Sequence, residues 1–239
     1  MLCKDEDQLK DKLVALFSNT NPEYIQNAVT AAQNELSRKV KQMRADMERL
    51  FDSQIQTLKD RGCPSQIIEA LVNGRAKVKV IDHAQTLNIA DCNLPFAPVI
   101  TPLYLGYHGI VAMVRNGDKS GYTYLDPRQI IDEEKVPTGL YYHFDIEDGT
   151  SRLGKKPEVS DRDIRSEKRL RSVAAEVVSI GTHTNELSRH YMDAVGSRYG
   201  SVGVPYLCLI GDRPKLGWDC LGDGDDRWGA ASCGSRLEL

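Results

Sequence analysis

Residues Asp226–Arg236 read DRWGAASCGSR, and they crowd two arginines, a tryptophan, a cysteine and two glycines into one short segment. A polypeptide usually becomes less constrained in composition near an end. We therefore predict that this segment forms an integral wall of the domain. Residues Gly196–Ser201, GSRYGS, use the same residue types, which predicts that the two segments meet at one place.

These two segments supply the candidate binding residues. An arginine guanidinium recognises carboxylate or phosphate, and glycine lets the backbone approach a ligand closely. The sequence therefore predicts a site for a small anionic ligand at these loops. The alternative is that the arginines pair with Asp212, Asp219 and Asp226 and hold the segment in place. The candidate ligand-binding residues are Arg198, Tyr199, Arg227, Trp228 and Arg236.

The composition argues against several classes of protein. The chain has 239 residues, enough for a substantial core, and a formal net charge of only −3, which disfavours a surface built mainly for nucleic acid or membrane. No stretch approaches the roughly 18 consecutive apolar residues of a membrane span, and the first residues lack the pattern of a signal peptide. We therefore expect a cytoplasmic protein without a membrane or nucleic-acid partner.

One long helix is predicted over residues 22–60. Asn21 and Pro22 suit a helix start, and neither proline nor glycine follows until Gly62. Apolar residues recur in steps of three and four, and the helix would be roughly 58 Å long at 1.5 Å per residue. A shorter amphipathic helix over residues 4–17 can cover only part of this stripe. The N-terminal helices, residues 1–74, are therefore predicted to form a homodimer, unless the C-terminal domain packs along the stripe instead.

Residues 75–239 are predicted to form a mixed, largely antiparallel β domain, so that the whole chain belongs to the α+β class. The proline-spaced run Leu94–Pro102 must be extended, but proline makes it unsuitable as a central strand. Residues 150–171 are predicted to be a mobile connection. The other predicted elements are a β-rich start at residues 78–81, a β-hairpin with strands at 110–114 and 122–125, a strand at 140–147 with alternating faces, a helix over 173–180 and a buried strand at 204–210.

Three segments carry a resemblance to a known family. They are Met113–Leu125, Gly196–Ser201 and Asp226–Arg236, and together they place the match over about residues 94–236. Across this range the chain resembles a family of uncharacterised proteins that is classified as a domain of unknown function. The resemblance implies a shared fold and implies no activity.

Enzymatic and structural functions are the alternatives to ligand binding. Cys233 is a weak candidate nucleophile, with His183 and His190 as possible bases, although its surroundings match neither a phosphatase loop nor the caspase or papain motifs. Asp145 and Glu147 share a predicted strand face and could act as an acid and base pair. A thiol- or carboxylate-dependent hydrolase is therefore one alternative, and a protein that binds a partner through the long helix is another.

No metal ion or other cofactor is predicted. The six cysteines are scattered, without a C-x-x-C pair or a histidine at zinc-finger spacing. His183 and His190 would be two turns apart on a helix, whereas zinc ligands on a helix are normally three or four residues apart.

Overall fold

The computed structural model describes residues 22–90, 92–222 and 226–239 and confirms the α+β class. Contacts divide the chain into two units, one ending at Asp46 and one comprising Met47–Leu239. The sequence predicts a boundary near residue 74, where the expected helices give way to the expected β-rich region. The helix predicted over residues 4–17 lies outside the described residues.

Helix α2 spans Pro22–Asp60, the bounds that the sequence predicts. Just beyond it, Gly62 has φ +82°, a backbone conformation that favours glycine. From Met47 onward the apolar stripe of α2 is buried in the second unit, and Phe51 and Leu58 are almost wholly enclosed. The predicted alternative, in which the C-terminal domain packs along the stripe, is therefore correct for the part of the helix from Met47 onward.

Two further helices follow, α3 (Ser65–Val72) and α4 (Ala76–Gln85). The predicted β-rich start at residues 78–81 is therefore wrong. Val80, Ile81 and Ala84 are buried at helical spacing, so tertiary packing overrides the β propensity of the branched residues.

The predicted hairpin is only partly correct. Residues 110–112 end helix α5 (Pro102–Ala112), and the hairpin is limited to β2 (Arg115–Asn116) and β3 (Lys119–Ser120). The following strand, β4 (Tyr122–Thr123), is not part of the hairpin and pairs in parallel with the later strand β11 (Arg213–Cys220). Ile110–Val114 is a continuous apolar run. The periodicity of such a run does not distinguish a buried helix from a buried strand.

A three-stranded sheet has the order β1 (Leu94–Val99), β6 (Tyr141–Ile146) and β14 (Ser235–Glu238). The proline-rich strand β1 is at the edge, as predicted. The alternation predicted for residues 140–147 is wrong, because helices cover both faces of β6. Tyr142 stacks on Phe51 of α2, with ring centroids 5.7 Å apart, whereas Tyr141 on the other face donates a hydrogen bond to Glu176 of helix α7 (Ala174–His183).

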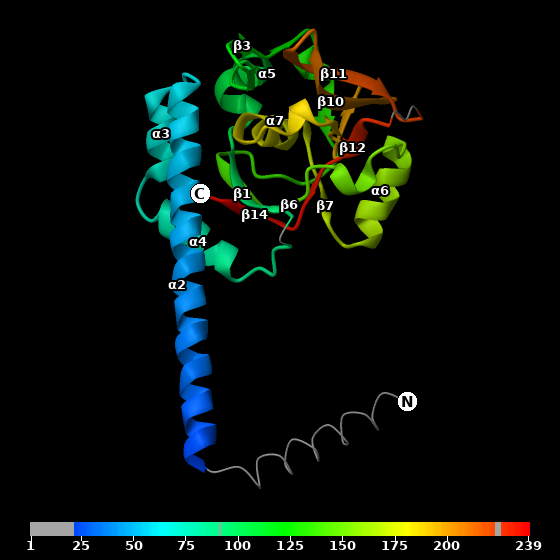
Figure 1. Cartoon of the computed structure of the whole chain (residues 1–239). Helices are drawn as coiled ribbons and strands as arrows, with labels where there is room; N and C mark the ends of the chain where they lie inside the picture. The colour runs from blue at the N-terminus through cyan, green and yellow to red at the C-terminus, as the bar shows by residue number, and fades with distance from the viewer. Residues whose placement is uncertain (1–21, 91, 223–225) are drawn as a thin grey trace, which may run out of the picture. The chain divides into compact units, whose positions relative to one another are not determined.

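A second sheet of seven strands is built around the long hairpin of β10 (Gly203–Ile210) and β11 (Arg213–Cys220). Strand β10 confirms the buried strand predicted at 204–210. Helix α7 (Ala174–His183) packs against both β1 and β10 and so lies between the two sheets (Figure 1). The remaining strands of this sheet are β4, β5 (Ile130–Asp132), β8 (Tyr191–Asp193), β9 (Ser197–Tyr199) and β12 (Trp228–Ala230).

The predicted mobile connection at residues 150–171 is an ordered part of the fold. It contains the 3-10 turn η2 (Thr150–Arg152), helix α6 (Pro157–Ser166) and strand β7 (Leu170–Arg171). The side chain of Arg152 is buried and forms ion pairs with Glu147 and Glu167. Arg152 and Arg171 of this segment are therefore buried within ion-pair networks, whereas most of its other charged residues are exposed. Two other 3-10 turns are η1 (Pro127–Gln129) and η3 (Glu186–Ser188).

The terminal segment is an integral wall, as predicted, because its three strands belong to three different sheets. Strand β12 pairs with β8, strand β13 (Ser232–Cys233) pairs with β7, and strand β14 pairs with β6. The segment Gly196–Ser201 approaches it only indirectly. Ser172 accepts a hydrogen bond from the backbone of Gly196 and donates one to Ala231, and so joins the two segments.

The backbones of Gly149 and Gly229 touch, and this contact yields a prediction. A β-carbon on Gly229 would overlap the carbonyl group of Gly149. We expect Gly229→Ala to lower the free energy of unfolding by about 1 to 3 kcal/mol, the range for overpacking. Urea denaturation measures it, with Gly222→Ala as the matched control, since a β-carbon there meets nothing within 4 Å. Equal midpoints for the two variants would contradict the prediction.

None of the helices in the described ranges is long and apolar enough to cross a membrane.

Candidate functional site

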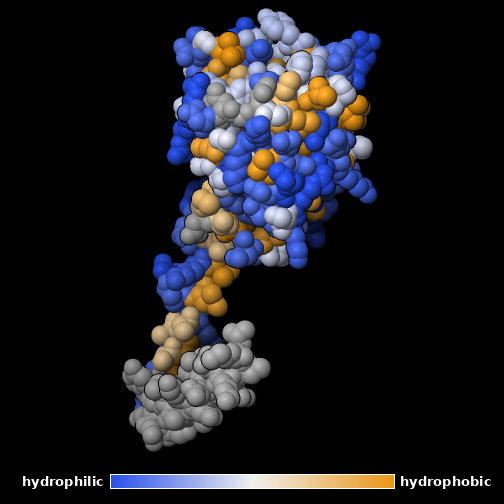
Figure 2. All heavy atoms as spheres, turned by 90° about the vertical axis from the view of Figure 1, so that its right-hand side faces the viewer, coloured by the Kyte–Doolittle hydropathy of each residue, from blue (hydrophilic) through white to orange (hydrophobic). Residues whose placement is uncertain are grey.

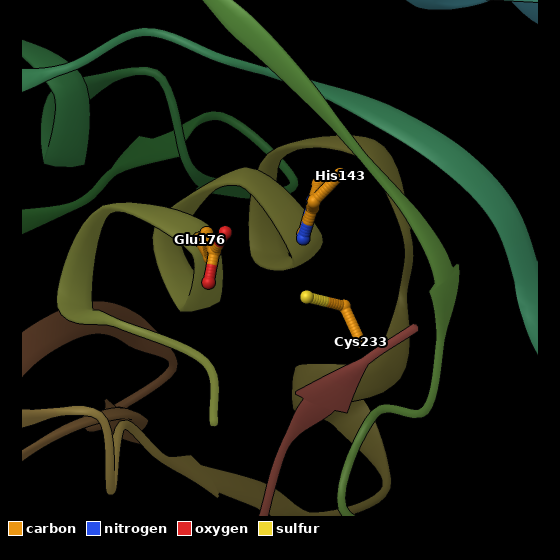
Figure 3. A group of neighbouring side chains, drawn as sticks. All are labelled: His143, Glu176 and Cys233. Carbon is orange, nitrogen blue, oxygen red and sulfur yellow. The ribbon is translucent and has the colours of Figure 1, made fainter. Parts of the chain in front are cut away.

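A cluster of three chemically versatile side chains lies in the interior. Strand β6 contributes His143, the first turn of α7 contributes Glu176, and β13 contributes Cys233. All three are completely buried, and one ligand atom from each lies within 4.8 Å of the others. A ring nitrogen of His143 and the sulfur of Cys233 point into the space beside Glu176 (Figure 3).

The carboxylate of Glu176 is saturated with hydrogen bonds. Its Oε1 accepts from Nε of Arg236 at 2.6 Å and from the hydroxyl of Tyr141 at 3.1 Å. Its Oε2 accepts from Nη2 of Arg236 at 2.9 Å and from the backbone N–H of Val173 at 3.0 Å. Burial works to raise the pKa of Glu176, but the bonds and charge of Arg236 outweigh it and hold the pKa below its usual value. Glu176 and Arg236 therefore form a buried ion pair.

The other two members of the cluster are neutral at pH 7. Burial raises the pKa of the Cys233 thiol, and the negative charge of Glu176 raises it further. Burial lowers the pKa of His143 to about 4. A nucleophilic cysteine needs a thiolate and access to a substrate, and Cys233 has neither in this conformation. A thiol-dependent hydrolase therefore gains no support from this geometry.

The same geometry bears on metal binding. Imidazole, thiolate and carboxylate together are a donor set that suits zinc and other transition metals. A metal ion at Glu176 would, however, have to displace Arg236, because both carboxylate oxygens already accept two hydrogen bonds. A second group, Asp148, Glu186 and His190, is partly exposed, and Nε2 of His190 is already 3.0 Å from the carbonyl oxygen of Asp148. We assign no metal to either group.

The structure separates the five residues predicted to bind an anion. Arg198 pairs with Glu133 at 3.1 Å, and Tyr199 stacks on Trp218. The guanidinium of Arg227 lies over the ring of Tyr191, and Trp228 packs edge-on against Tyr206. Arg236 binds Glu176. The carboxylates that pair with Arg198 and Arg236 are thus glutamates, and not Asp212, Asp219 or Asp226.

The histidines predicted to assist Cys233 lie elsewhere. Both ring nitrogens of His183 are enclosed without a hydrogen-bond partner among the described residues, and burial lowers its pKa to about 3. The histidine that lies beside Cys233 in the cluster is His143. The alternation predicted for residues 140–147 would place His143 on an exposed face of the strand. Asp145 and Glu147 do not act as a free acid and base pair either, since Asp145 pairs with Arg169 and Glu147 with Arg152.

A cavity of about 380 Å³ lies directly beside the Glu176–Arg236 pair. Tyr141 connects the two, because it lines the cavity and its hydroxyl binds Glu176. The walls are mainly apolar, and one charged side chain, Asp132, is part of them. Its lining residues are Thr101, Pro102, Leu103, Asp132, Val136, Pro137, Thr138, Tyr141, Val173 and Ala175.

Asp132 is held in place at the end of strand β5. Its Oδ1 accepts a hydrogen bond of 2.6 Å from the Ser197 hydroxyl, which in turn accepts one from the backbone of Ala174. The residue is exposed to solvent, yet the surrounding protein raises the pKa of its carboxyl. A position of the carboxylate in a hollow of the surface explains both the exposure of Asp132 and its raised pKa. No sequence motif marks Asp132, and only the pairing of β5 with β9 brings Ser197 to it.

A second cavity, of about 570 Å³, lies on the other side of residues 136–138. Its lining includes two basic side chains, Arg236 and Lys135, and two acidic ones, Glu134 and Glu238. Because these charges balance and Arg236 already pairs with Glu176, the second cavity does not favour an anion.

Comparison of the chain with protein-family models, with curated proteins and with solved structures finds no match. The resemblance to a domain of unknown function therefore stays a prediction.

Proposed function

We propose that the unit Met47–Leu239 binds a small, partly apolar molecule that carries an amino group, in the cavity beside Asp132. The observation that carries this proposal is an exposed aspartate, Asp132, in a cavity of about 380 Å³ with otherwise mainly apolar walls. Pockets of roughly 300 to 1,000 Å³ with few polar groups are typical of small-molecule sites.

The chemistry of the cavity selects the ligand class. Val136, Pro137 and Val173 offer contacts to an apolar body, and burial of that body is favourable. An ammonium group would form a charge-assisted hydrogen bond with Asp132, which is worth roughly 1.5 to 3 kcal/mol. An anionic ligand would be repelled by the carboxylate of Asp132, and the Glu176 charge nearby is balanced by Arg236.

An anionic ligand at Arg198, Arg227 and Arg236 stays a prediction with weaker support. Arg198 and Arg236 form ion pairs, and Arg227 lies over Tyr191. Arg198 is in β9, Arg227 directly precedes β12 and Arg236 is in β14, so the three arginines come from different elements.

Substitution of Asp132 tests the proposal. We expect benzylamine and butylamine to raise the melting temperature of the wild-type protein, and benzoate and butyrate to leave it unchanged. Asp132→Asn keeps an oxygen for the Ser197 hydroxyl but removes the charge, so amine affinity should fall roughly 10- to 100-fold. Asp118→Asn, an exposed aspartate in the β2–β3 hairpin, should behave like wild type.

The pH dependence of amine binding gives a second readout. The pKa of Asp132 is raised, so amine binding should be weak at low pH and should strengthen as the carboxyl ionises. Calorimetric titration at several pH values measures this trend. Binding that is equal for amines and carboxylates, or that survives Asp132→Asn unchanged, would overturn the proposal.

A further inference from the structure

The first half of helix α2 carries an apolar stripe on its surface. Val29, Leu36, Val40 and Met43 are 44%, 64%, 48% and 48% exposed. Their spacing of seven, four and three residues places them on one face of the helix. Figure 2 shows apolar residues gathered along this part of α2.

This stripe has no cover within the described residues. Residues 22–46 consist of α2 alone, and the same stripe becomes buried from Met47 onward, where the second unit begins. A helix with one apolar face is stable in water when that face packs against another surface. The segment 22–46 therefore calls for a partner with a matching apolar stripe about 37 Å long at 1.5 Å per residue.

The net charge of the segment changes from negative to positive along the helix, and Glu35 forms ion pairs with Arg38 and Lys39 of the same helix. Residues 22–37 contain Glu23 and Glu35 and no lysine or arginine. Residues 38–46 contain four basic residues, Arg38, Lys39, Lys41 and Arg44, against one acidic residue, Asp46. Two such helices in parallel would place the basic ends side by side. Two in antiparallel orientation would place each basic end beside an acidic end.

We infer that residues 22–46 pair with the same segment of a second copy of this chain, in antiparallel orientation. Charge complementarity selects both the second copy as the partner and the antiparallel direction, because each basic end then lies beside an acidic end of the other copy. The pairing places Val29 of each copy opposite Val40 of the other, so that the centre of the pair lies between residues 34 and 35, beside Leu36. In this register Glu23 of each copy lies near both Arg44 and Asp46 of the other. The long α2 is thus an assembly element as well as part of the core.

Sedimentation velocity of the full chain tests the association. Wild type should sediment as a dimer at high micromolar concentration. Leu36→Glu should be monomeric, since it places a charge at the centre of the stripe. Ala31→Glu introduces the same charge at an exposed position off the stripe and should stay dimeric. A monomeric wild type, or equal effects of the two substitutions, would overturn the inference.

Crosslinking tests the orientation. Chains carrying Val29→Cys and chains carrying Val40→Cys are mixed and mildly oxidised, and the linked peptides are identified by mass spectrometry. Antiparallel pairing should give the mixed link between positions 29 and 40. Links of 29 to 29 and of 40 to 40 would show a parallel pair and would overturn the antiparallel assignment. Far-ultraviolet circular dichroism of each variant checks that the helix is retained.

Discussion

Arg236→Met is expected to lower the free energy of unfolding by roughly 3 to 5 kcal/mol, because it leaves a buried charge without its partner. Glu176 is fully enclosed, and Arg236 contributes one hydrogen bond to each of its oxygens. Methionine keeps a long apolar side chain at this position. Most of the loss in the free energy of unfolding therefore comes from the Glu176 carboxylate, which is left without its partner. Thermal and urea unfolding measure it.

A double-mutant cycle separates the ion pair from simple packing. Glu176→Gln removes the charge while keeping the shape, and combining it with Arg236→Met should recover part of the stability. Arg227→Met is the matched control, since Arg227 is exposed and lies over a tyrosine ring, and it should cost less than about 1 kcal/mol. If Arg236→Met unfolds like Arg227→Met, the ion pair does not support the fold.

The sizes of the side chains alone would favour the opposite order of effects in this segment, with Trp228 as a large buried side chain and Arg236 as a surplus charge. In the structure Trp228 is only partly buried, against Tyr191 and Tyr206. Arg236 is instead the enclosed residue, with its side chain 6% exposed. Trp228→Ala should therefore cost less than Arg236→Met.

Asp193→Asn is expected to make the stability of the protein less sensitive to a rise in pH from about 4 to about 7. Asp193 is 2% exposed, its Oδ2 has no hydrogen-bond partner among the described residues, and burial together with the charge of Asp219 raises its pKa to about 7. An unfolded aspartate has a pKa near 3.9. Because the unfolded chain releases this proton first, stability should decrease as pH rises from about 4 to about 7.

The size of this effect follows from the two pKa values. Between pH 5 and pH 8 the stability of Asp193→Asn relative to wild type should rise by roughly 2 to 3 kcal/mol. Asp118→Asn, at an exposed position, should keep the wild-type pH profile. Urea unfolding across this pH range provides the measurement. Parallel stability curves for wild type and Asp193→Asn would show that the Asp193 carboxyl is not desolvated.

Local sequence signals predicted the elements with clear ends. Helix α2 has a proline at its start and a glycine past its end, and β10 is an apolar run followed by a turn at Gly211. Helices α4 and α5 were missed because Val80 and Ile110 lie in apolar runs without a decisive period. Strand β6 was recognised, but its two buried faces depend on helices from distant parts of the chain.

The candidate site was predictable only in part. Arg236 and Cys233 were singled out by the crowded terminal segment, and both are in the buried cluster. His143 belongs to a strand and Glu176 to a helix. No spacing rule in the sequence links either residue to Cys233 or Arg236. Asp132 depends on the pairing of β5 with β9, two short strands far apart in sequence. Side-chain convergence of this kind comes from topology, which the local pattern does not encode.

The distribution of residues 228–238 over three sheets affects how the chain folds during synthesis. Strands β8, β7 and β6 each pair with a strand of this segment. None of the three sheets is therefore complete until residues 228–238 have left the ribosome. Strand β6 has an unpaired edge in the meantime, and such edges favour aggregation. A ribosome stalled before Trp228 would therefore hold a chain in which β6 exposes the backbone N–H and C=O groups that otherwise pair with β14. Folding of this unit is expected to be complete only after residues 228–238 have left the ribosome.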